Sequence, residues 1–282
     1  MKNTMKIGII GGTGKMGRFF ASVFAKAGFE VLVSGTKTPV TSEEIAEVAD
    51  IVMISVPIHL TDEIIASVAP IMRDEQILCD LTSLKVRPVT TMLTSAAEVI
   101  GLHPMFGPSV ASLSGQTIIV TPARCRDESC TILTDVFTQQ GACITYCTPE
   151  EHDRMMAIIQ GLTHFKTLVM AETLRKMGMK PDVTTAFMSP VYQIEMNIAG
   201  RLLAQDASLY ADILTLNPYI PEVLQTSSRV CQDIVDLIIS QNTEGFCSLF
   251  NADADWFGSF CASAMRDSDV LIRTMVQNHE AT

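Results

Sequence analysis

Three groups of residues in this sequence have the types and spacing to carry chemistry. The segment Gly12-Thr13-Gly14-Lys15-Met16-Gly17 follows the pattern G-x-G-x-x-G, whose backbone can approach a pyrophosphate closely. His103 follows a short apolar run, and a neutral imidazole can accept a proton near physiological pH. Arg201 carries a planar guanidinium that suits two-pronged binding of a carboxylate. These residues predict a dinucleotide site, a candidate base and a candidate anion-binding cation.

The glycine-rich segment has the context that a dinucleotide site requires. A strand is expected over Lys6–Ile10, a helix over Gly14–Ala27 and a second strand over Glu30–Ser34. Enzymes that use NAD usually carry an acid at the end of this second strand. Here the end of the strand and the residues after it are Ser34-Gly35-Thr36-Lys37, which contain no acid. Ser34, Thr36 and Lys37 could instead hold a 2′-phosphate, although Lys37 could also be a solvated loop charge. We therefore expect NADP rather than NAD.

The remaining elements of the first half position these groups. Short apolar runs alternate with helical patterns such as Leu60–Val68, which predicts βαβ units and a doubly wound parallel sheet. His103 would stand at the carboxyl end of one strand, where open α/β sheets place their ligands. The further strands are expected at Ile51–Ser55, Gln76–Asp80, Glu98–Leu102, Thr117–Val120 and Ala142–Tyr146.

The second half of the sequence changes to helical patterns. Thr148-Pro149-Glu150-Glu151 combines a capping residue, a proline at the first helical position and a capping-box glutamate. We therefore expect a dinucleotide-binding Rossmann domain over residues 1–148 and an all-α domain over residues 149–282. The helical half is more apolar than one small bundle needs, so we expect it to carry substrate contacts and to form a homodimer.

Composition excludes several classes of protein. A formal net charge of -11 argues against nucleic-acid binding, because such a charge repels polyanions. The sequence has no run of about 18 apolar residues and no apolar signal-peptide core, so we expect a cytoplasmic protein without a membrane span. The eight cysteines are scattered without C-x-x-C spacing and are interpreted as reduced thiols rather than metal ligands.

Several motifs together resemble one family along nearly the whole sequence. The most specific are Leu102-His103-Pro104-Met105-Phe106-Gly107-Pro108 and Gly200-Arg201-Leu202-Leu203-Ala204-Gln205. Both are similar to prephenate dehydrogenases, especially to the form fused to chorismate mutase in enteric bacteria. We expect no mutase or regulatory domain in this chain. Further matching segments are Ser55-Val56-Pro57-Ile58-His59, Asp80-Leu81-Thr82-Ser83-Leu84-Lys85, Glu151-His152-Asp153 and Gln160-Gly161-Leu162-Thr163-His164-Phe165.

The resemblance implies oxidative decarboxylation of prephenate to 4-hydroxyphenylpyruvate with NAD(P). It gives His103 the role of the catalytic histidine, with Ser83 near the same substrate hydroxyl. Arg201 would bind the ring carboxylate and His164 the pyruvyl side chain. Tyr210 would reach the partner subunit's site. Ser55, Val56 and Pro57 would join the glycine turn at the cofactor.

Some residues depart from the family pattern or could have a purely structural role. Gln160 and Gln205 stand where many relatives have serine, so the contacts to the substrate side chain stay open. His164 could be a core histidine, Ser83 a turn residue and Tyr210 a core aromatic. Asp153, Gln160 and His164 have a spacing that would place them on one helical face.

Three other functions remain open at this point. Arogenate, in which an amine replaces the side-chain ketone, is an alternative substrate. A β-hydroxyacid dehydrogenase would need a helical lysine base, for which Lys166 and Lys176 lack the glycine-rich context. A non-catalytic NADPH sensor would need neither His103 nor Arg201.

Overall fold

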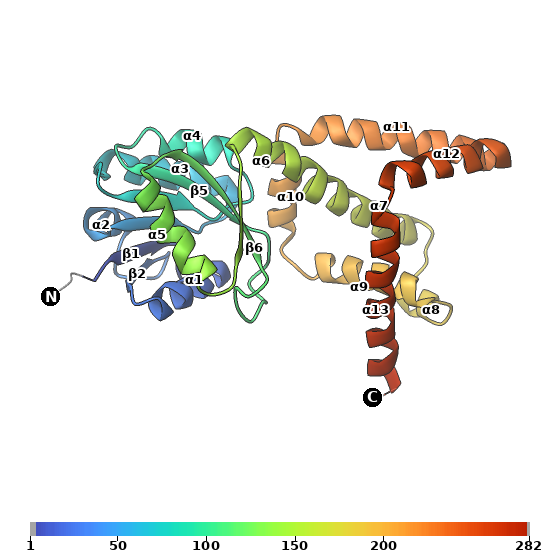
Figure 1. Cartoon of the computed structure of the whole chain (residues 1–282), viewed down its shortest axis with the longest axis horizontal. Coiled ribbons are helices and arrows are strands. Elements are labelled where there is room, and N and C mark those ends of the chain that lie inside the picture. Colours follow the sequence, from blue (N-terminus) through green and yellow to red (C-terminus); the bar gives the residue numbers. More distant parts are fainter. Residues whose placement is uncertain (1–3, 281–282) are drawn as a thin grey trace. The chain divides into compact units, whose positions relative to one another are not determined.

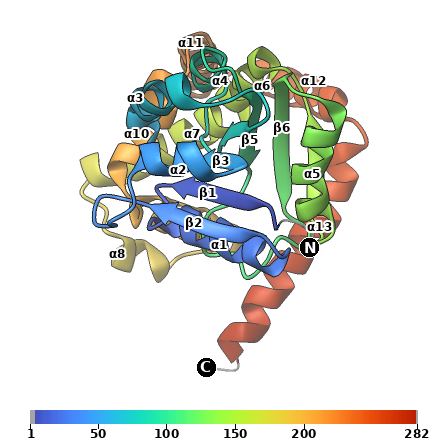
Figure 2. The ribbon, with the colours of Figure 1, turned by 90° about the vertical axis from the view of Figure 1, so that its left-hand side faces the viewer.

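The computed structural model describes residues 4–280, so the first three and last two residues of the two predicted domains lie outside it. Seven strands form one sheet in the order β2-β1-β3-β4-β5-β6-β7 (Figures 1 and 2). They are β1 (Lys6–Ile10), β2 (Glu30–Ser34), β3 (Ile51–Ile54), β4 (Ile77–Asp80), β5 (Glu98–Pro104), β6 (Thr117–Arg124) and β7 (Cys143–Tyr146). The seven expected strands are confirmed to within a few residues at their ends.

The doubly wound sheet is confirmed, but one strand departs from the expected parallel arrangement. β6 runs antiparallel to β5, with His103 opposite Ile119, while every other pair of neighbouring strands is parallel. Parallel neighbours need a crossover, usually a helix, to return the chain to the same edge of the sheet. No helix lies between Pro104 and Thr117, so the chain turns back directly at the edge where His103 stands.

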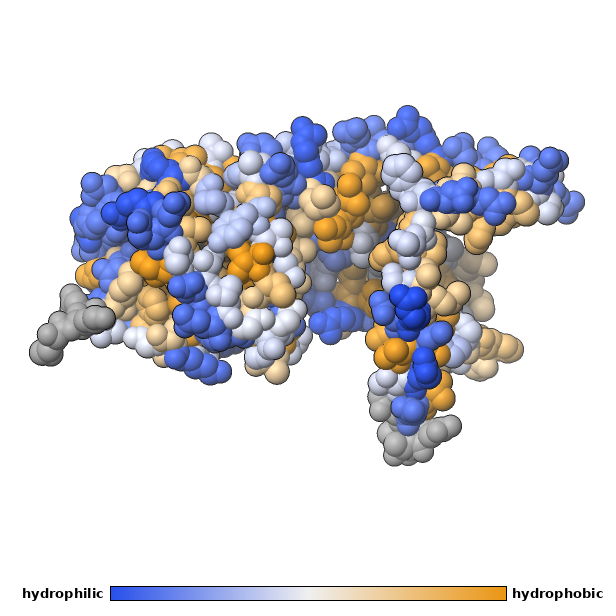
Figure 3. Space-filling model, viewed as in Figure 1, coloured by the Kyte–Doolittle hydropathy of each residue, from blue (hydrophilic) through white to orange (hydrophobic). Residues whose placement is uncertain are grey.

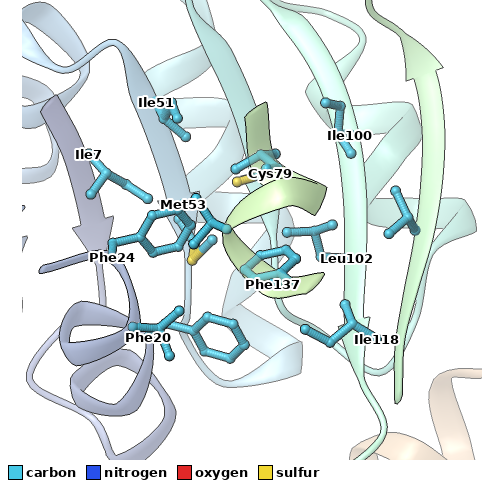
Figure 4. Packing of buried hydrophobic residues seen from close by; sticks show 14 of the residues in the cluster. Ile7, Phe20, Phe24, Ile51, Met53, Cys79, Ile100, Leu102, Ile118 and Phe137 are labelled. Atoms are coloured by element: carbon cyan, nitrogen blue, oxygen red, sulfur yellow. The ribbon is translucent and has the colours of Figure 1, made fainter. Parts of the chain in front are cut away.

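Helices cover both faces of the sheet, as a doubly wound fold requires. On one face, α1 (Lys15–Lys26) and α5 (Asp127–Thr138) bury Phe20, Phe24 and Phe137 against the strands (Figure 4). On the other face, α2 (Ser42–Val48), α3 (Ile58–Val68) and α4 (Val86–Met92) supply a second buried cluster. The sheet thus lies between two layers of buried apolar side chains. Its carboxyl edge can therefore hold side chains in fixed positions.

The described chain divides into two compact units. The first contains the sheet and continues to Ile159, and it also includes Ser208–Tyr219 with most of α10 (Ala207–Leu216). Its helix α6 (Pro149–Met156) begins with the expected capping box, in which the Thr148 hydroxyl accepts from the Glu151 N–H. The second unit comprises Gln160–Ala207 and the residues from Ile220 onward. The domain boundary expected near residue 148 stays a prediction.

Within residues 160–207 and 220–280, the second unit contains helices and no strand. A π-helical segment, η2 (Ala157–Leu162), leads into it. Within it, α7 packs against α9 and α9 against α13. Its helices are α7 (Thr163–Lys176), α8 (Pro181–Thr185), α9 (Pro190–Leu203), α11 (Ile220–Ile239), α12 (Thr243–Phe257) and α13 (Phe260–Glu280).

Many large apolar side chains of the second unit are exposed. Phe187 and Trp256 are each 88% exposed, and apolar residues stand beside charged ones along α13 (Figure 3). A single helical unit that exposes this much apolar surface resembles half of an obligate interface more than a finished domain. None of the helices within residues 4–280 combines the length and the apolar composition that crossing a bilayer demands.

Candidate active site

The candidate base, His103, lies within β5 rather than just beyond it. The strand continues to Pro104, and the His103 side chain is only 3% exposed. Its Nδ1 lies 2.8 Å from Nε2 of His152, a residue of α6 that is also buried. Nδ1 of His152 lies 2.7 Å from Oδ1 of Asp153. His103, His152 and Asp153 therefore form one buried hydrogen-bonded chain.

Asp153 is held by backbone groups from two directions. Its two carboxylate oxygens accept from the N–H groups of Lys85 and Val86, at 2.8 and 3.0 Å, so the side chain caps the start of α4. Its own carbonyl accepts from Nδ2 of Asn217 at 2.8 Å. Both carboxylate oxygens receive a backbone N–H group at the start of α4, which is the bonding of an acceptor. Asp153 is thus a fixed acceptor.

This chain of hydrogen bonds determines where the protons of both imidazoles lie. Because Asp153 can only accept, Nδ1 of His152 must carry the proton, and Nε2 of His152 is then an acceptor. Nδ1 of His103 must therefore donate to His152. The remaining nitrogen of His103, Nε2, is left as the acceptor nitrogen. A base that accepts a proton from a hydroxyl needs this tautomer.

A buried ion pair lies behind the histidine. Lys85 and Asp80 pair through Nζ and Oδ2, and both side chains are fully buried. Nζ of Lys85 also donates to the Leu102 carbonyl at 2.8 Å, next to His103 in the chain. Burial lowers the pKa of Lys85, and the Asp80 carboxylate opposes that shift. The pair thus ties the end of β4 to the end of β5.

The surroundings keep the histidine neutral. Burial is the main cause that holds the pKa of His103 well below its ordinary value, and electrostatic interactions with His152 and Lys85 lower it further. Burial also lowers the pKa of His152, although Asp153 opposes that shift. His103 is therefore an uncharged imidazole at neutral pH.

Ser83 comes to the same edge of the sheet. It is half-buried in the loop after β4, and β4 pairs in parallel with β5, so Asp80 lies opposite Gly101. Tyr210 lies half-buried on α10, which the fold also assigns to the first unit.

The glycine turn has the geometry of a pyrophosphate cradle. The N–H groups of Gly11 and Gly12 both donate to the Ser34 carbonyl, at 2.9 and 3.0 Å. A Cβ on Gly17 would lie 2.5 Å from the Gly11 carbonyl oxygen, so only glycine lets α1 begin this close to the turn. Gly14 precedes α1 as its N-cap, which aims the N-terminal N–H groups of that helix at the turn. The chain therefore fits a bound dinucleotide.

The other predicted cofactor residues gather around this turn. A Cβ on Gly11 would lie 2.2 Å from the Ser55 carbonyl oxygen and 3.0 Å from Cγ1 of Val56, so the segment after β3 borders the turn. Pro57 is the N-cap residue of α3. Thr36 and Lys37 are exposed in the loop after β2. Thr13 and Lys15 are exposed and Met16 is half-buried.

The remaining predicted residues belong to the second unit. Gln160 lies in the π-helical segment, half-buried His164 at the start of α7, and Arg201 near the end of α9. Nε2 of Gln205 donates to the Arg201 carbonyl at 3.1 Å. Burial lowers the pKa of His164. The substrate-binding roles of these residues stay predictions.

A π-helical segment lies in the stretch of chain that spans three residues placed by their sequence spacing on one helical face. Asp153, Gln160 and His164 were expected on one helical face, but η2 interrupts the 3.6-residue period between them. Sequence analysis also missed the role of His152. Its signal was the adjacent pair His152-Asp153, which follows the capping box and brings an imidazole and a carboxylate to the same buried turn.

A dinucleotide cradle and a neutral buried base, both toward the carboxyl ends of strands in one sheet, are typical of a dinucleotide-dependent dehydrogenase. A family model described as "Prephenate dehydrogenase, nucleotide-binding domain" matches residues 25–146. A second, "Prephenate dehydrogenase, dimerization domain", matches residues 148–252. The chain belongs to the prephenate dehydrogenase family, and it is an NAD(P)-dependent oxidoreductase.

Individual relatives agree with the family models. A "Probable arogenate/prephenate dehydrogenase" of Methanocaldococcus jannaschii is 36% identical, over 99% of this chain and 67% of its own length. A "T-protein" of Haemophilus influenzae is 34% identical, over 95% of this chain and 71% of its own. The crystal structure of prephenate dehydrogenase from A. aeolicus, with hydroxyphenyl propionate and NAD+, shares the fold with a TM-score of 0.71. It is 21% identical and covers 89% of this chain and 96% of that one.

The buried ion pair gives a stability prediction. Lys85→Met should lower the free energy of unfolding by about 3–5 kcal/mol, because it leaves the Asp80 carboxylate buried without its partner. Asp80→Asn combined with Lys85→Met should recover a large part of that loss. Arg87→Met, which breaks the exposed pair with Asp62, should cost less than about 1 kcal/mol. Urea unfolding followed by circular dichroism measures all three, and a single Lys85→Met variant as stable as wild type would contradict the prediction.

Proposed function

We propose that this chain catalyses the oxidative decarboxylation of prephenate to 4-hydroxyphenylpyruvate with NADP. The observation that supports this most is the buried chain from Asp153 through His152 to His103, which makes Nε2 of His103 a neutral acceptor nitrogen in the unit that carries the dinucleotide cradle. The membership in the family and the names of its relatives supply the substrate.

His103 would act on the ring hydroxyl of the substrate. As the carbon that bears this hydroxyl loses its hydride, the oxygen becomes carbonyl-like and its proton grows more acidic. Nε2 of His103 accepts the hydrogen bond from that proton and stabilises the developing charge. The bound nicotinamide would supply the hydride acceptor. The ring carboxylate then departs as carbon dioxide, the electron pair of its bond makes the ring aromatic, and His103 returns the shared proton to the phenol oxygen of the product.

The other predicted residues would hold the substrate. Arg201 would bind the ring carboxylate, and His164 with Gln160 and Gln205 would contact the pyruvyl side chain. Ser83 would share the ring hydroxyl with His103, because both follow neighbouring strands to the same edge. Tyr210 would close the site toward a partner subunit.

The choice between cofactors and between substrates needs one experiment. The loop after β2 has no acid for the ribose hydroxyls, which favours NADP, whereas the related crystal structure holds NAD+. A rate assay at ~340 nm should cross prephenate and arogenate with NADP+ and NAD+. We expect the highest kcat/KM with prephenate and NADP+. Turnover with arogenate alone would make the chain an arogenate dehydrogenase, and no turnover with either would refute the proposal.

The proposed base gives a kinetic prediction. His103→Asn should keep the KM for prephenate within a few-fold and lower kcat by about 10²–10⁴-fold, the usual contribution of a general base. In the wild type, kcat/KM should fall as acid protonates His103. Because the pKa of His103 is held well below its ordinary value, this fall should occur below about pH 6.5. A His103→Asn variant with unchanged kcat would remove this residue from the mechanism.

The proposed carboxylate ligand gives a second kinetic prediction. Arg201→Ala should raise KM by roughly 10–200-fold, the value of a charge-assisted hydrogen bond. It should lower kcat less, because the carboxylate leaves as a neutral molecule. Arg201→Lys should recover only part of the loss, since a point charge cannot bind both oxygens in the same plane. Arg229→Ala, which removes an exposed arginine of α11, is the matched control. A folded Arg201→Ala enzyme with wild-type KM would assign the carboxylate to another cation.

The apolar helices give a prediction about assembly. The second unit matches a dimerization domain and exposes large apolar side chains, so we expect a homodimer through residues of roughly 150–282. Light scattering at concentrations from micromolar downward measures the mass. An active species with the mass of one chain across that range would contradict the dimer.

A further inference from the structure

Gly35 directly follows β2, the region where an NAD site usually carries its acid, and it lies close to the glycine turn. A Cβ built there would lie 2.3 Å from Oγ1 of Thr13, 3.1 Å from its Cγ2 and 3.2 Å from its Cβ. The backbone does not require glycine at this position, because Gly35 is not among the residues with positive φ. What the fold requires at position 35 is therefore the absence of a side chain.

Thr13 cannot easily move out of the way. Rotation about χ1 could turn a hydrogen toward position 35, but Cβ of Thr13 would still lie 3.2 Å from the added Cβ, which is tighter than ordinary contact. The Thr13 carbonyl accepts a hydrogen bond from Nη1 of Arg18, one turn into α1. The turn itself is bound to the end of β2, because the Ser34 carbonyl accepts from two N–H groups of the turn. The contact between Thr13 and Gly35 is thus enforced from both sides.

The polar groups around this contact suit an anion. Arg18 is exposed beside Thr13, and Lys37 is exposed two residues after Gly35. Ser34 is 2% exposed, and its Oγ has no hydrogen-bond partner within residues 4–280. A buried hydroxyl without a partner is costly unless a ligand oxygen satisfies it. Two cations and an available hydroxyl match a phosphate better than a pair of ribose hydroxyls.

We propose that the contact between Thr13 and Gly35 selects the cofactor, with Arg18 as a second cation for its 2′-phosphate. Thr13 excludes an acidic side chain from position 35. If an acid were present there, its carboxylate would bind the ribose hydroxyls and repel a 2′-phosphate. Arg18 and Lys37 then bind the 2′-phosphate. This inference rests on the proposed preference for NADP and names the residues that impose it.

The test measures binding of the adenosine half of the cofactor, apart from turnover. The probes are adenosine 2′,5′-bisphosphate and adenosine 5′-monophosphate, which differ only in the 2′-phosphate, and isothermal titration calorimetry gives their Kd values for the full chain. The variants are Thr13→Ala, Gly35→Asp and the combination of both. Circular dichroism confirms that each variant is folded.

The two positions should act together. Gly35→Asp alone should weaken both probes by about tenfold or more, since the new side chain collides with Thr13 and displaces the turn. Adding Thr13→Ala should return the Kd of the monophosphate to within a few-fold of the wild-type value, while binding of the bisphosphate stays weak. Thr13→Ala alone should keep the wild-type order. If Gly35→Asp by itself yields a tight monophosphate site, or if the combination still prefers the bisphosphate, the selection does not depend on this contact.

Arg18 has a matched control on its own helix. Arg18→Gln should weaken the bisphosphate by about 10–100-fold, as expected for a lost charge-assisted hydrogen bond, and change the monophosphate by less than about threefold. Lys26→Gln removes an exposed cation from the last turn of α1 and should change neither probe. Equal weakening of both probes by Arg18→Gln would reduce this residue to a structural support of the turn.

The measurement separates this inference from the proposal on which it rests. A wild-type chain that binds the monophosphate more tightly refutes the NADP preference. A wild-type preference for the bisphosphate, together with independent effects at positions 13 and 35, refutes only the role of their contact.

Discussion

The site depends on the hydrogen bonds that the carboxylate of Asp153 accepts. The carboxylate joins α6 to the first turn of α4 through the N–H groups of Lys85 and Val86, and it also fixes the imidazole of His152. A carboxylate with these partners has no freedom to rotate without losing a bond to a helix start. The position of the capping interaction and the tautomer of two histidines are therefore consequences of the same group.

The sheet supplies the second constraint. β4 and β5 are parallel neighbours, so the loop with Ser83 and the end of β5 with His103 meet at one edge. The buried pair of Lys85 and Asp80 then crosses between these strands and binds the carbonyl before His103. An ion pair without access to water adds little net stability, but it penalises any arrangement that separates its partners. We infer that the ion pair fixes the register of β4 against β5.

Much of this architecture follows from sequence patterns. The strands are short apolar runs, the glycine turn stands between a strand and a helix, and Thr148 with Glu151 marks the start of α6. The pairing of β6 was not predictable from hydrophobicity, because a strand buried in a sheet has the same composition in either direction. The role of His152 was hidden for a related reason. A histidine in a helix says nothing about its neighbours until the fold brings β5 and α6 together.

The π-helical segment shows a further limit. Residue spacing predicts a shared face only while the helical period holds, and η2 changes that period between Asp153 and His164. The contact between Thr13 and Gly35 was equally invisible, since the sequence shows a missing acid but not what excludes it. Such features depend on distances across the chain rather than on residue types.

The central claim is that Asp153 and His152 hold His103 as the tautomer with its proton on Nδ1. The chain has five histidines, so labelling them with ¹⁵N gives a spectrum simple enough to assign, with His103→Asn identifying the signals of interest. At neutral pH, the account predicts a protonated Nδ1 and an unprotonated Nε2 for His103. A His103 ring with its proton on Nε2, or one that is already a cation at neutral pH, would contradict it.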